Sequence, residues 1–150
     1  VFMIEMTLER ALELYQVREV LEGLAARLAA SHENAKNLEK MAEVLENQAR
    51  AIEKGDLPGY SRTDFDFHSC LYKMSRSSAL IEMLESLKMK MQPITLEVRP
   101  ILPRLLEDHR EILEAIRSKD PDRSEKILRR HNRMLQNQIQ KEIETLGKKG

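Results

Sequence analysis

Residues 104–146 read RLLEDHREILEAIRSKDPDRSEKILRRHNRMLQNQIQKEIETL, and this stretch decides the fold. Its apolar residues recur every three or four positions on both sides of an SKDP break, which is the spacing of two amphipathic helices. Asp120 is suited to cap the second helix, and Pro121 fits its first turn. Because the connection is short, we predict two antiparallel neighbours, Arg104–Arg117 and Asp122–Leu146.

The same periodicity covers most of the chain, whereas strand-like alternation is almost absent. We therefore predict an all-α protein, an antiparallel bundle of six to seven helices. The remaining predicted helices are Leu8–Ser31, Glu33–Lys54, Tyr60–Met74 and Ala79–Val98. On the first of them the predicted buried face consists of Leu14, Val17, Leu21, Leu24, Ala25 and Leu28.

Turn residues and prolines set the predicted helix ends. A Gly55-Asp-Leu-Pro-Gly59 cluster ends the second helix, and a serine of Ser75–Ser78 is expected to cap the fourth. Pro93 should bend the fourth helix, because proline lacks the N–H of the helical hydrogen bond. Residues Gly147–Gly150 are predicted to fray.

Length and composition bound the class of protein. The 150 residues fit one domain, 1–150, and Lys plus Arg equals Asp plus Glu at 25 each. No net charge or basic run favours DNA binding by this chain alone. A single cysteine, Cys70, and the lack of a leader or a long apolar span predict a cytoplasmic protein outside the membrane. The first residue, Val1, suggests a piece of a longer polypeptide.

Four ionisable residues interrupt apolar helical stripes: Asp64, His68, His109 and His131. Asp64 and His68 are four residues apart and so share a helix face. His109 and His131 lie ten and twelve residues from Lys119 in the turn, so they are nearly level across the hairpin. We predict that all four bind one divalent metal.

Three imidazoles and one carboxylate suit Zn²⁺, Ni²⁺, Mn²⁺, Co²⁺ or Fe²⁺, with zinc or nickel favoured, and leave room for water or a small acid. The alternative is that each histidine is an ordinary core residue bonded to a protein partner.

Arg18 also lies among apolar residues of the first helix, where a guanidinium needs a partner. That partner is either the carboxylate of a ligand or Glu22, four residues on. The methionines Met83, Met89 and Met91 are expected in the core or at a subunit interface.

Three segments and one histidine resemble the FCD domain, the C-terminal effector-binding domain of FadR-type GntR transcriptional regulators. They are Leu14–Ala30 (LYQVREVLEGLAARLAA), Asp64–His68 (DFDFH), Asp108–Ile116 (DHREILEAI) and His131. The resemblance implies a metal held by Asp64, His68, His109 and His131, and a small carboxylate effector held by the metal and Arg18. It also implies a winged helix-turn-helix, absent here, through which DNA would be bound.

We therefore expect a metabolite-sensing, homodimeric regulatory domain rather than an enzyme. The alternative is a metal-dependent hydrolase or redox enzyme on a helical bundle. The sequence offers little for that alternative, since it has no His-Glu-x-x-His motif and no pair of Glu-x-x-His motifs.

Overall fold

The computed structural model describes residues 6–32, 34–92 and 96–149, and in these ranges it is helical and has no strand. This confirms the predicted all-α class. The elements in these ranges are α1 (Leu8–Ala30), α2 (Ala35–Glu53), α3 (Leu57–Met74), α4 (Ser78–Met91), a 3-10 turn (Arg99–Ile101), α5 (Leu102–Arg117) and α6 (Pro121–Lys149).

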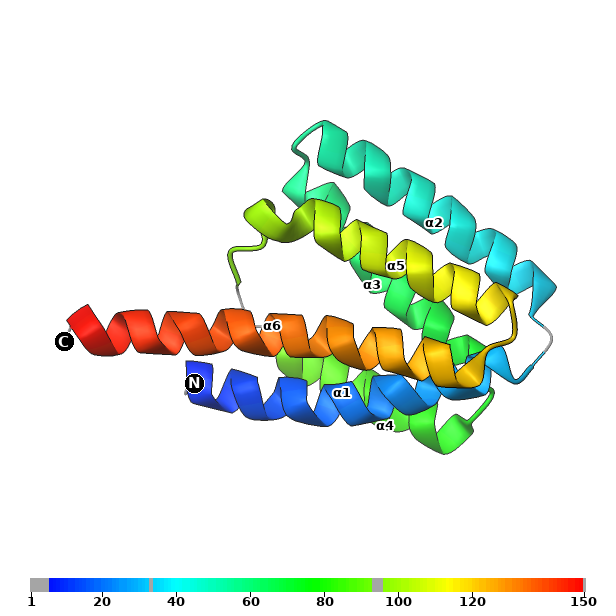
Figure 1. Cartoon of the computed structure of the whole chain (residues 1–150), viewed down its shortest axis with the longest axis horizontal. Helices are drawn as coiled ribbons and strands as arrows, with labels where there is room; N and C mark the ends of the chain where they lie inside the picture. The colour runs from blue at the N-terminus through cyan, green and yellow to red at the C-terminus, as the bar shows by residue number, and fades with distance from the viewer. Residues whose placement is uncertain (1–5, 33, 93–95, 150) are drawn as a thin grey trace, which may run out of the picture.

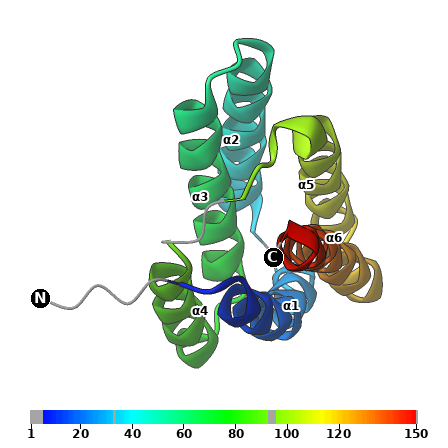
Figure 2. The same cartoon turned by 90° about the vertical axis from the view of Figure 1, so that its left-hand side faces the viewer.

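Helix α1 contacts four other helices, α3, α4, α5 and α6. Its main neighbour is α6, which runs beside it in the opposite direction (Figure 1). Helices α2, α3 and α5 form the other side of the bundle, and α4 packs beside α1 (Figure 2). The predicted antiparallel hairpin of residues 104–146 is thus formed by α5 and α6.

Side-chain caps fix several helix starts, because they satisfy N–H groups that have no partner within the helix. Ser77 accepts a hydrogen bond from the Leu80 N–H at 3.3 Å, and Asp120 accepts one from the Arg123 N–H at 3.1 Å. Both caps were predicted from the sequence. Asp56 caps α3 in the same way, through the Gly59 N–H at 2.9 Å.

Four predicted boundaries were wrong. Helix α3 begins at Leu57 and α5 at Leu102, because Pro58 and Pro103 are tolerated in a first turn where no N–H bond is required. Helix α4 ends at Met91 rather than Val98, as expected when the next residues lead into Pro93. The predicted bend at Pro93 and the predicted start at Glu33 lie outside the described residues.

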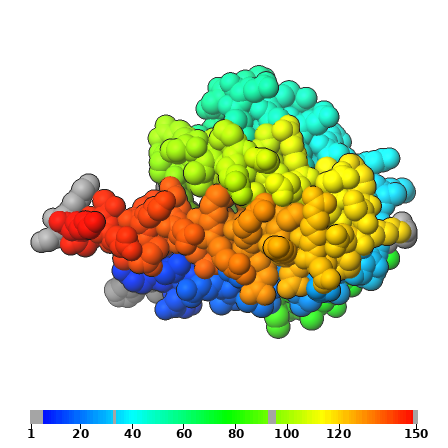
Figure 3. Space-filling view, viewed as in Figure 1, coloured from blue at the N-terminus to red at the C-terminus, as the bar shows by residue number. Residues whose placement is uncertain are grey.

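The fourth error concerns the tail. Helix α6 continues to Lys149 instead of fraying from Gly147, since the Gln, Lys and Glu residues before the glycine favour helix strongly. In the space-filling view this end of α6 projects beyond the body of the protein (Figure 3). No helix in the described ranges is both long and apolar enough to span a membrane.

The buried face of α1 also differs from the prediction. Val17 is 50% exposed and Leu24 is 43% exposed, while Ala25, Ala26 and Ala29 are fully buried. Small residues allow the neighbouring helices to approach closely. At Gly23 an added Cβ would lie 2.8 Å from Cγ of Arg129 on α6, so any larger residue would require the Arg129 side chain to move.

Candidate metal and ligand site

Three helices bring the three predicted histidines to one point. His68 on α3, His109 on α5 and His131 on α6 are all buried, and one nitrogen from each lies within 4.8 Å of the other two. The His109 and His131 rings are 4.9 Å apart between centroids, and Phe67 stacks on His109 at 4.1 Å. The rings are therefore packed against one another inside the bundle.

Each histidine has its Nδ1 atom held by an oxygen from another residue. The pairs are His68 with Glu22 Oε2 at 2.6 Å, His109 with Gln48 Oε1 at 2.8 Å and His131 with Asp108 Oδ2 at 3.1 Å. These oxygens are acceptors, so each Nδ1 carries the proton and donates it when the ring is neutral. The Nε2 atoms then carry the lone pairs, as in metal-binding histidines, although Arg18 Nη2 lies within hydrogen-bond distance of the His68 Nε2 atom, at 3.1 Å.

The His109 Nε2 atom is the member of the cluster that most clearly lacks a hydrogen-bond partner among the described residues. It is buried and forms no hydrogen bond to any described residue. Buried polar atoms are nearly always satisfied, so an exception calls for a missing partner. Its nearest acidic atom is Asp64 Oδ1, at 3.6 Å.

Asp64 faces the same point from α3. Its Oδ1 atom lies 3.4 Å from His68 Nε2 as well as 3.6 Å from His109 Nε2, and its side chain is 34% exposed. Burial would raise the pKa of this carboxyl group, but His68 and His109 outweigh it and lower the pKa. Asp64 is therefore ionised beside the cluster, and the four donors could together hold a divalent transition metal.

The charge states of two histidines differ because their neighbours differ. Burial lowers the pKa of His68, yet the carboxylates of Glu22 and Asp64 together outweigh it and raise that pKa overall. Burial and the adjacent His131 hold the pKa of His109 well below its usual range. His109 is thus a neutral donor, which is the form that binds a metal.

Glu22 is the hub of the buried polar network. It accepts hydrogen bonds from Tyr72 Oη at 2.7 Å and Asn132 Nδ2 at 2.9 Å, and its Oε1 atom lies 3.0 Å from Arg18 Nε. Burial would raise the Glu22 pKa, but Arg18 and His68 hold it well below its usual range. The Arg18–Glu22 ion pair that the sequence allowed is therefore present.

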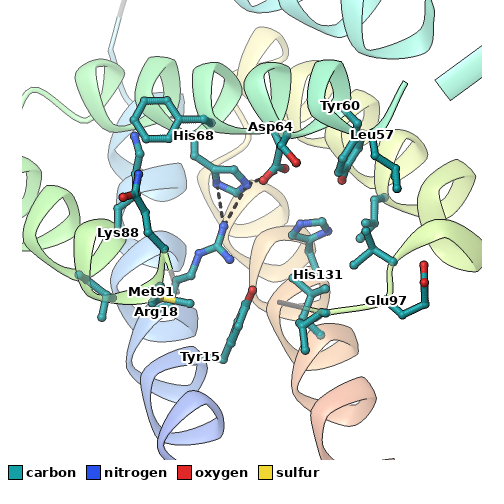
Figure 4. Close-up of a pocket in the computed structure, with 18 of the residues that line it drawn as sticks. Tyr15, Arg18, Leu57, Tyr60, Asp64, His68, Lys88, Met91, Glu97 and His131 are labelled. Atoms are coloured by element: carbon teal, nitrogen blue, oxygen red, sulfur yellow. Dashed lines mark hydrogen bonds and ion pairs between the residues drawn. The ribbon is translucent and has the colours of Figure 1, made fainter. Parts of the chain in front are cut away.

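Arg18 also lines a cavity, so its two predicted roles do not exclude each other. Its Nη2 atom lies 3.1 Å from His68 Nε2 and 3.3 Å from Nδ1 (Figure 4). Asp64, His68 and His131 line the same cavity, which has a volume of about 880 Å³. Much of the remaining wall is apolar, including Leu57, Leu84, Leu87, Leu105 and Leu135. This size and lining suit a small organic ligand.

Sequence analysis missed the residues that orient the histidines, although the same signal marks them. Gln48 lies among Met41, Val44 and Leu45 on the buried face of α2, and Asp108 lies on the buried face of α5. Both are polar residues at apolar helical positions. Asn132, one residue after His131, is likewise a buried polar residue that sequence analysis missed.

Comparisons with known proteins agree with the fold. Residues 13–134 match the family described as FCD domain. The regulator McbR of Escherichia coli K12, an HTH-type transcriptional regulator, is 30% identical over 115 residues, which are 73% of this chain and 52% of McbR. A probable D-xylose utilization operon transcriptional repressor of Paenarthrobacter nicotinovorans is 26% identical over 121 residues, 79% of this chain and 53% of that protein.

Two solved structures have a similar fold. A GntR protein of Streptococcus agalactiae superimposes with a TM-score of 0.76 at 27% identity, over 85% of this chain and 58% of that one. E. coli McbR/YncC superimposes with a TM-score of 0.77 at 24% identity, over 90% and 66%, which shows the shared fold. The chain spans about half the length of the two curated relatives.

Proposed function

The chain belongs to the FCD domain family, and from that premise we propose that it is the effector-binding domain of a GntR-family transcriptional regulator. In this proposal Asp64, His68, His109 and His131 hold a divalent transition metal. The observation that carries it is the convergence of the three histidines, each with its Nδ1 atom paired, while the His109 Nε2 atom has no hydrogen bond to any described residue.

The donor set favours zinc or nickel over calcium or magnesium, because imidazole nitrogen is a softer ligand than oxygen. When bound, such an ion would supply a positive centre for an anion. Glu22, Gln48 and Asp108 would keep the three rings in place by holding Nδ1.

A small carboxylate is the proposed effector. Glu22 engages the Nε edge of Arg18, while the Nη2 edge is directed towards His68 at the cavity wall (Figure 4). A guanidinium suits carboxylate recognition because its N–H groups match two carboxylate oxygens. Arg18 is accordingly the proposed effector-binding residue, beside the metal ligands.

Regulation of transcription requires more than this domain. We infer that residues 1–150 form one effector-binding and dimerisation domain, and that DNA is bound by a winged helix-turn-helix elsewhere in the whole protein. An effector shifts such a protein only if it binds two arrangements of the DNA-binding domains with different affinity. The role is that of a regulator and not of an enzyme, as the names of the relatives suggest.

A homodimer forms part of the proposal, and its face is expected on α1 and α4. Val17, Val20 and Leu24 on α1 and Met83 on α4 are large apolar side chains that are exposed. Val17 and Met83 also line a shallow groove between the two helices. An exposed apolar area of this kind favours a protein partner. Analytical ultracentrifugation of wild type and Val20→Glu would test the face, with a shift towards monomer expected in the variant.

Isothermal titration tests the metal and effector together. The domain, stripped with a chelator, would be titrated with ZnCl2 or NiCl2, and the loaded and stripped forms would then be titrated with short carboxylates. We expect one metal per chain and carboxylate binding that needs both metal and Arg18. Binding that is equal in the stripped form and in Arg18→Ala would contradict the proposal.

A further inference from the structure

Lys88 on α4 is a charged residue of the cavity that the proposed function does not use. Its side chain is only 12% exposed, and it lines the cavity together with Leu84 and Leu87 of the same helix. Its Nζ atom lies 3.5 Å from the centroid of the Phe65 ring and donates a hydrogen bond to Ser69 Oγ. The ammonium group is thus held among aromatic and neutral groups.

The charge of Lys88 is only partly balanced. Its carboxylate neighbour, Glu85, lies 3.6 Å away and is 46% exposed to solvent, which weakens the attraction. Burial lowers the Lys88 pKa, and Glu85 offsets that effect in part. A cation removed from water without a close buried partner costs free energy, so the site is prepared for an anion.

The other carboxylates near this part of the cavity are engaged. Glu22 binds Arg18, His68, Tyr72 and Asn132. Asp64 faces His68 and His109, while Glu97 pairs with Arg99 at 2.6 Å. An incoming anion would therefore compete for the Lys88 ammonium group with the part-exposed Glu85, and not with Glu22, Asp64 or Glu97.

Arg18 and Lys88 reach the cavity from different helices. Figure 4 shows both on the same side of the pocket, with His68 beside them, whereas Tyr60 and Leu57 line the opposite side. One carboxylate cannot use the whole arrangement, because the proposed metal and Arg18 already provide its partners. A second anionic group on the same ligand would find Lys88.

We propose that the effector is a dicarboxylate or a similar small acid with two anionic groups, the second of which is bound by Lys88. This inference rests on the proposed function, which places the first carboxylate at Arg18. The apolar wall formed by Leu84 and Leu87 would contact the carbon chain between the two groups.

Matched acids separate this proposal from simple charge attraction. Succinate and butyrate share a four-carbon backbone, and glutarate and pentanoate a five-carbon backbone, so each pair differs in the second carboxylate. The zinc-loaded domain would be titrated calorimetrically with all four acids. The variants would be Lys88→Met, Lys88→Gln and Lys88→Arg, with Lys126→Met as a control at an exposed position on α6.

We expect Lys88→Met and Lys88→Gln to weaken binding of the better dicarboxylate at least about tenfold, as for loss of a charged hydrogen bond. Binding of the matched monocarboxylate should change less than about twofold, because that acid lacks the second carboxylate that would contact Lys88. Lys88→Arg should restore most of the affinity, and Lys126→Met should behave as wild type. Lys88→Met and Lys88→Gln both remove the charge, so the test still stands if one of them does not fold. Thermal unfolding would show such a defect.

The outcomes distinguish the two levels of inference. Metal-dependent binding of monocarboxylates and dicarboxylates with no selective loss in the Lys88 variants would overturn the role of Lys88 alone. Failure of the wild type to bind any of the four acids would overturn the carboxylate effector and the Lys88 proposal together.

Discussion

Two polar networks join α1 to its neighbours, and they are built in opposite ways. In the network nearer the surface, the buried Glu19 of α1 pairs with the more exposed Arg129 and Arg133 of α6 and accepts a hydrogen bond from Gln136. In the interior, Glu22 gathers Arg18, His68, Tyr72 and Asn132. The two glutamates are less than one helical turn apart, yet one faces the edge of the bundle and the other its centre.

The two networks differ in whether their polar atoms are all hydrogen-bonded. The surface pairs satisfy one another and lie beside water, so their contribution is screened. In the interior, Glu22, Gln48 and Asp108 each hold one histidine by Nδ1, and the buried His109 Nε2 atom has no hydrogen bond to any described residue. Side chains that are held towards a common point, with a buried atom unsatisfied there, are the basis of the proposed metal site.

Removing the interior hub should have the largest effect. Glu22→Ala leaves Arg18 buried without its carboxylate, and we expect a loss of about 3–5 kcal/mol in the free energy of unfolding. Urea denaturation would measure it, with the exposed Glu13→Ala on the same helix as control. A loss no greater than that of the control would show that the interior network is no more cohesive than the surface.

Metal should come next. A ligand that binds only the folded state at a hundred times its Kd adds about 2.7 kcal/mol to stability. We expect ZnCl2 or NiCl2 to raise the thermal midpoint of the wild type and of His32→Gln, whose histidine lies outside the cluster. His109→Gln should lose most of this increase. An equal increase in His109→Gln would place the bound metal elsewhere.

Gln48 separates orientation from stability. Its Nε2 atom is buried without a hydrogen bond to the described residues, while its Oε1 atom accepts the hydrogen bond of His109 Nδ1. Gln48→Leu therefore removes both the unsatisfied amide nitrogen and the oxygen that orients His109. We expect metal affinity to fall about 10- to 100-fold, as for other supports of metal-binding histidines. Competition with a chromogenic chelator would measure it, and Gln140→Leu at an exposed position would serve as control. Unchanged affinity would mean that Gln48 does not orient His109.

The surface network should give the smallest change. Arg133→Ala leaves Glu19 with Arg129 and Gln136, so we expect a loss of at most about 1 kcal/mol, which high salt should reduce further. Urea denaturation at two salt concentrations would measure both effects. A salt-independent loss as large as that of Glu22→Ala would remove the distinction between the two networks.

The helical pattern was readable from the sequence because apolar periodicity, serine and aspartate caps and prolines act locally. It gave the extent of α1 but wrongly buried Val17 and Leu24, because the packing of α1 depends on alanines and Gly23 that carry little apolar signal. It also extended α4 past Met91, because the apolar spacing continues beyond the last residue of the helix.

The candidate metal residues were readable for a related reason. A polar, titratable side chain at an apolar helical position has few explanations, and His68, His109 and His131 all lie at such positions. Lys88 gave no such signal, because a lysine in the last turn of a helix is ordinary. Which cation faces a cavity depends on how α4 is rotated against α1 and α3, and that is a tertiary property.

The position of Glu22 has a consequence for dividing the protein into pieces. One carboxylate is bonded to Tyr72 in the middle of the chain and to Asn132 in its last helix. A fragment without α6 would keep the buried Glu22 carboxylate but lose the Asn132 hydrogen bond to it and the helix that shields it from solvent. We therefore expect α1, α3 and α6 to exchange their slowest amide hydrogens at a common rate, as one cooperative unit in which neither end of the bundle is dispensable.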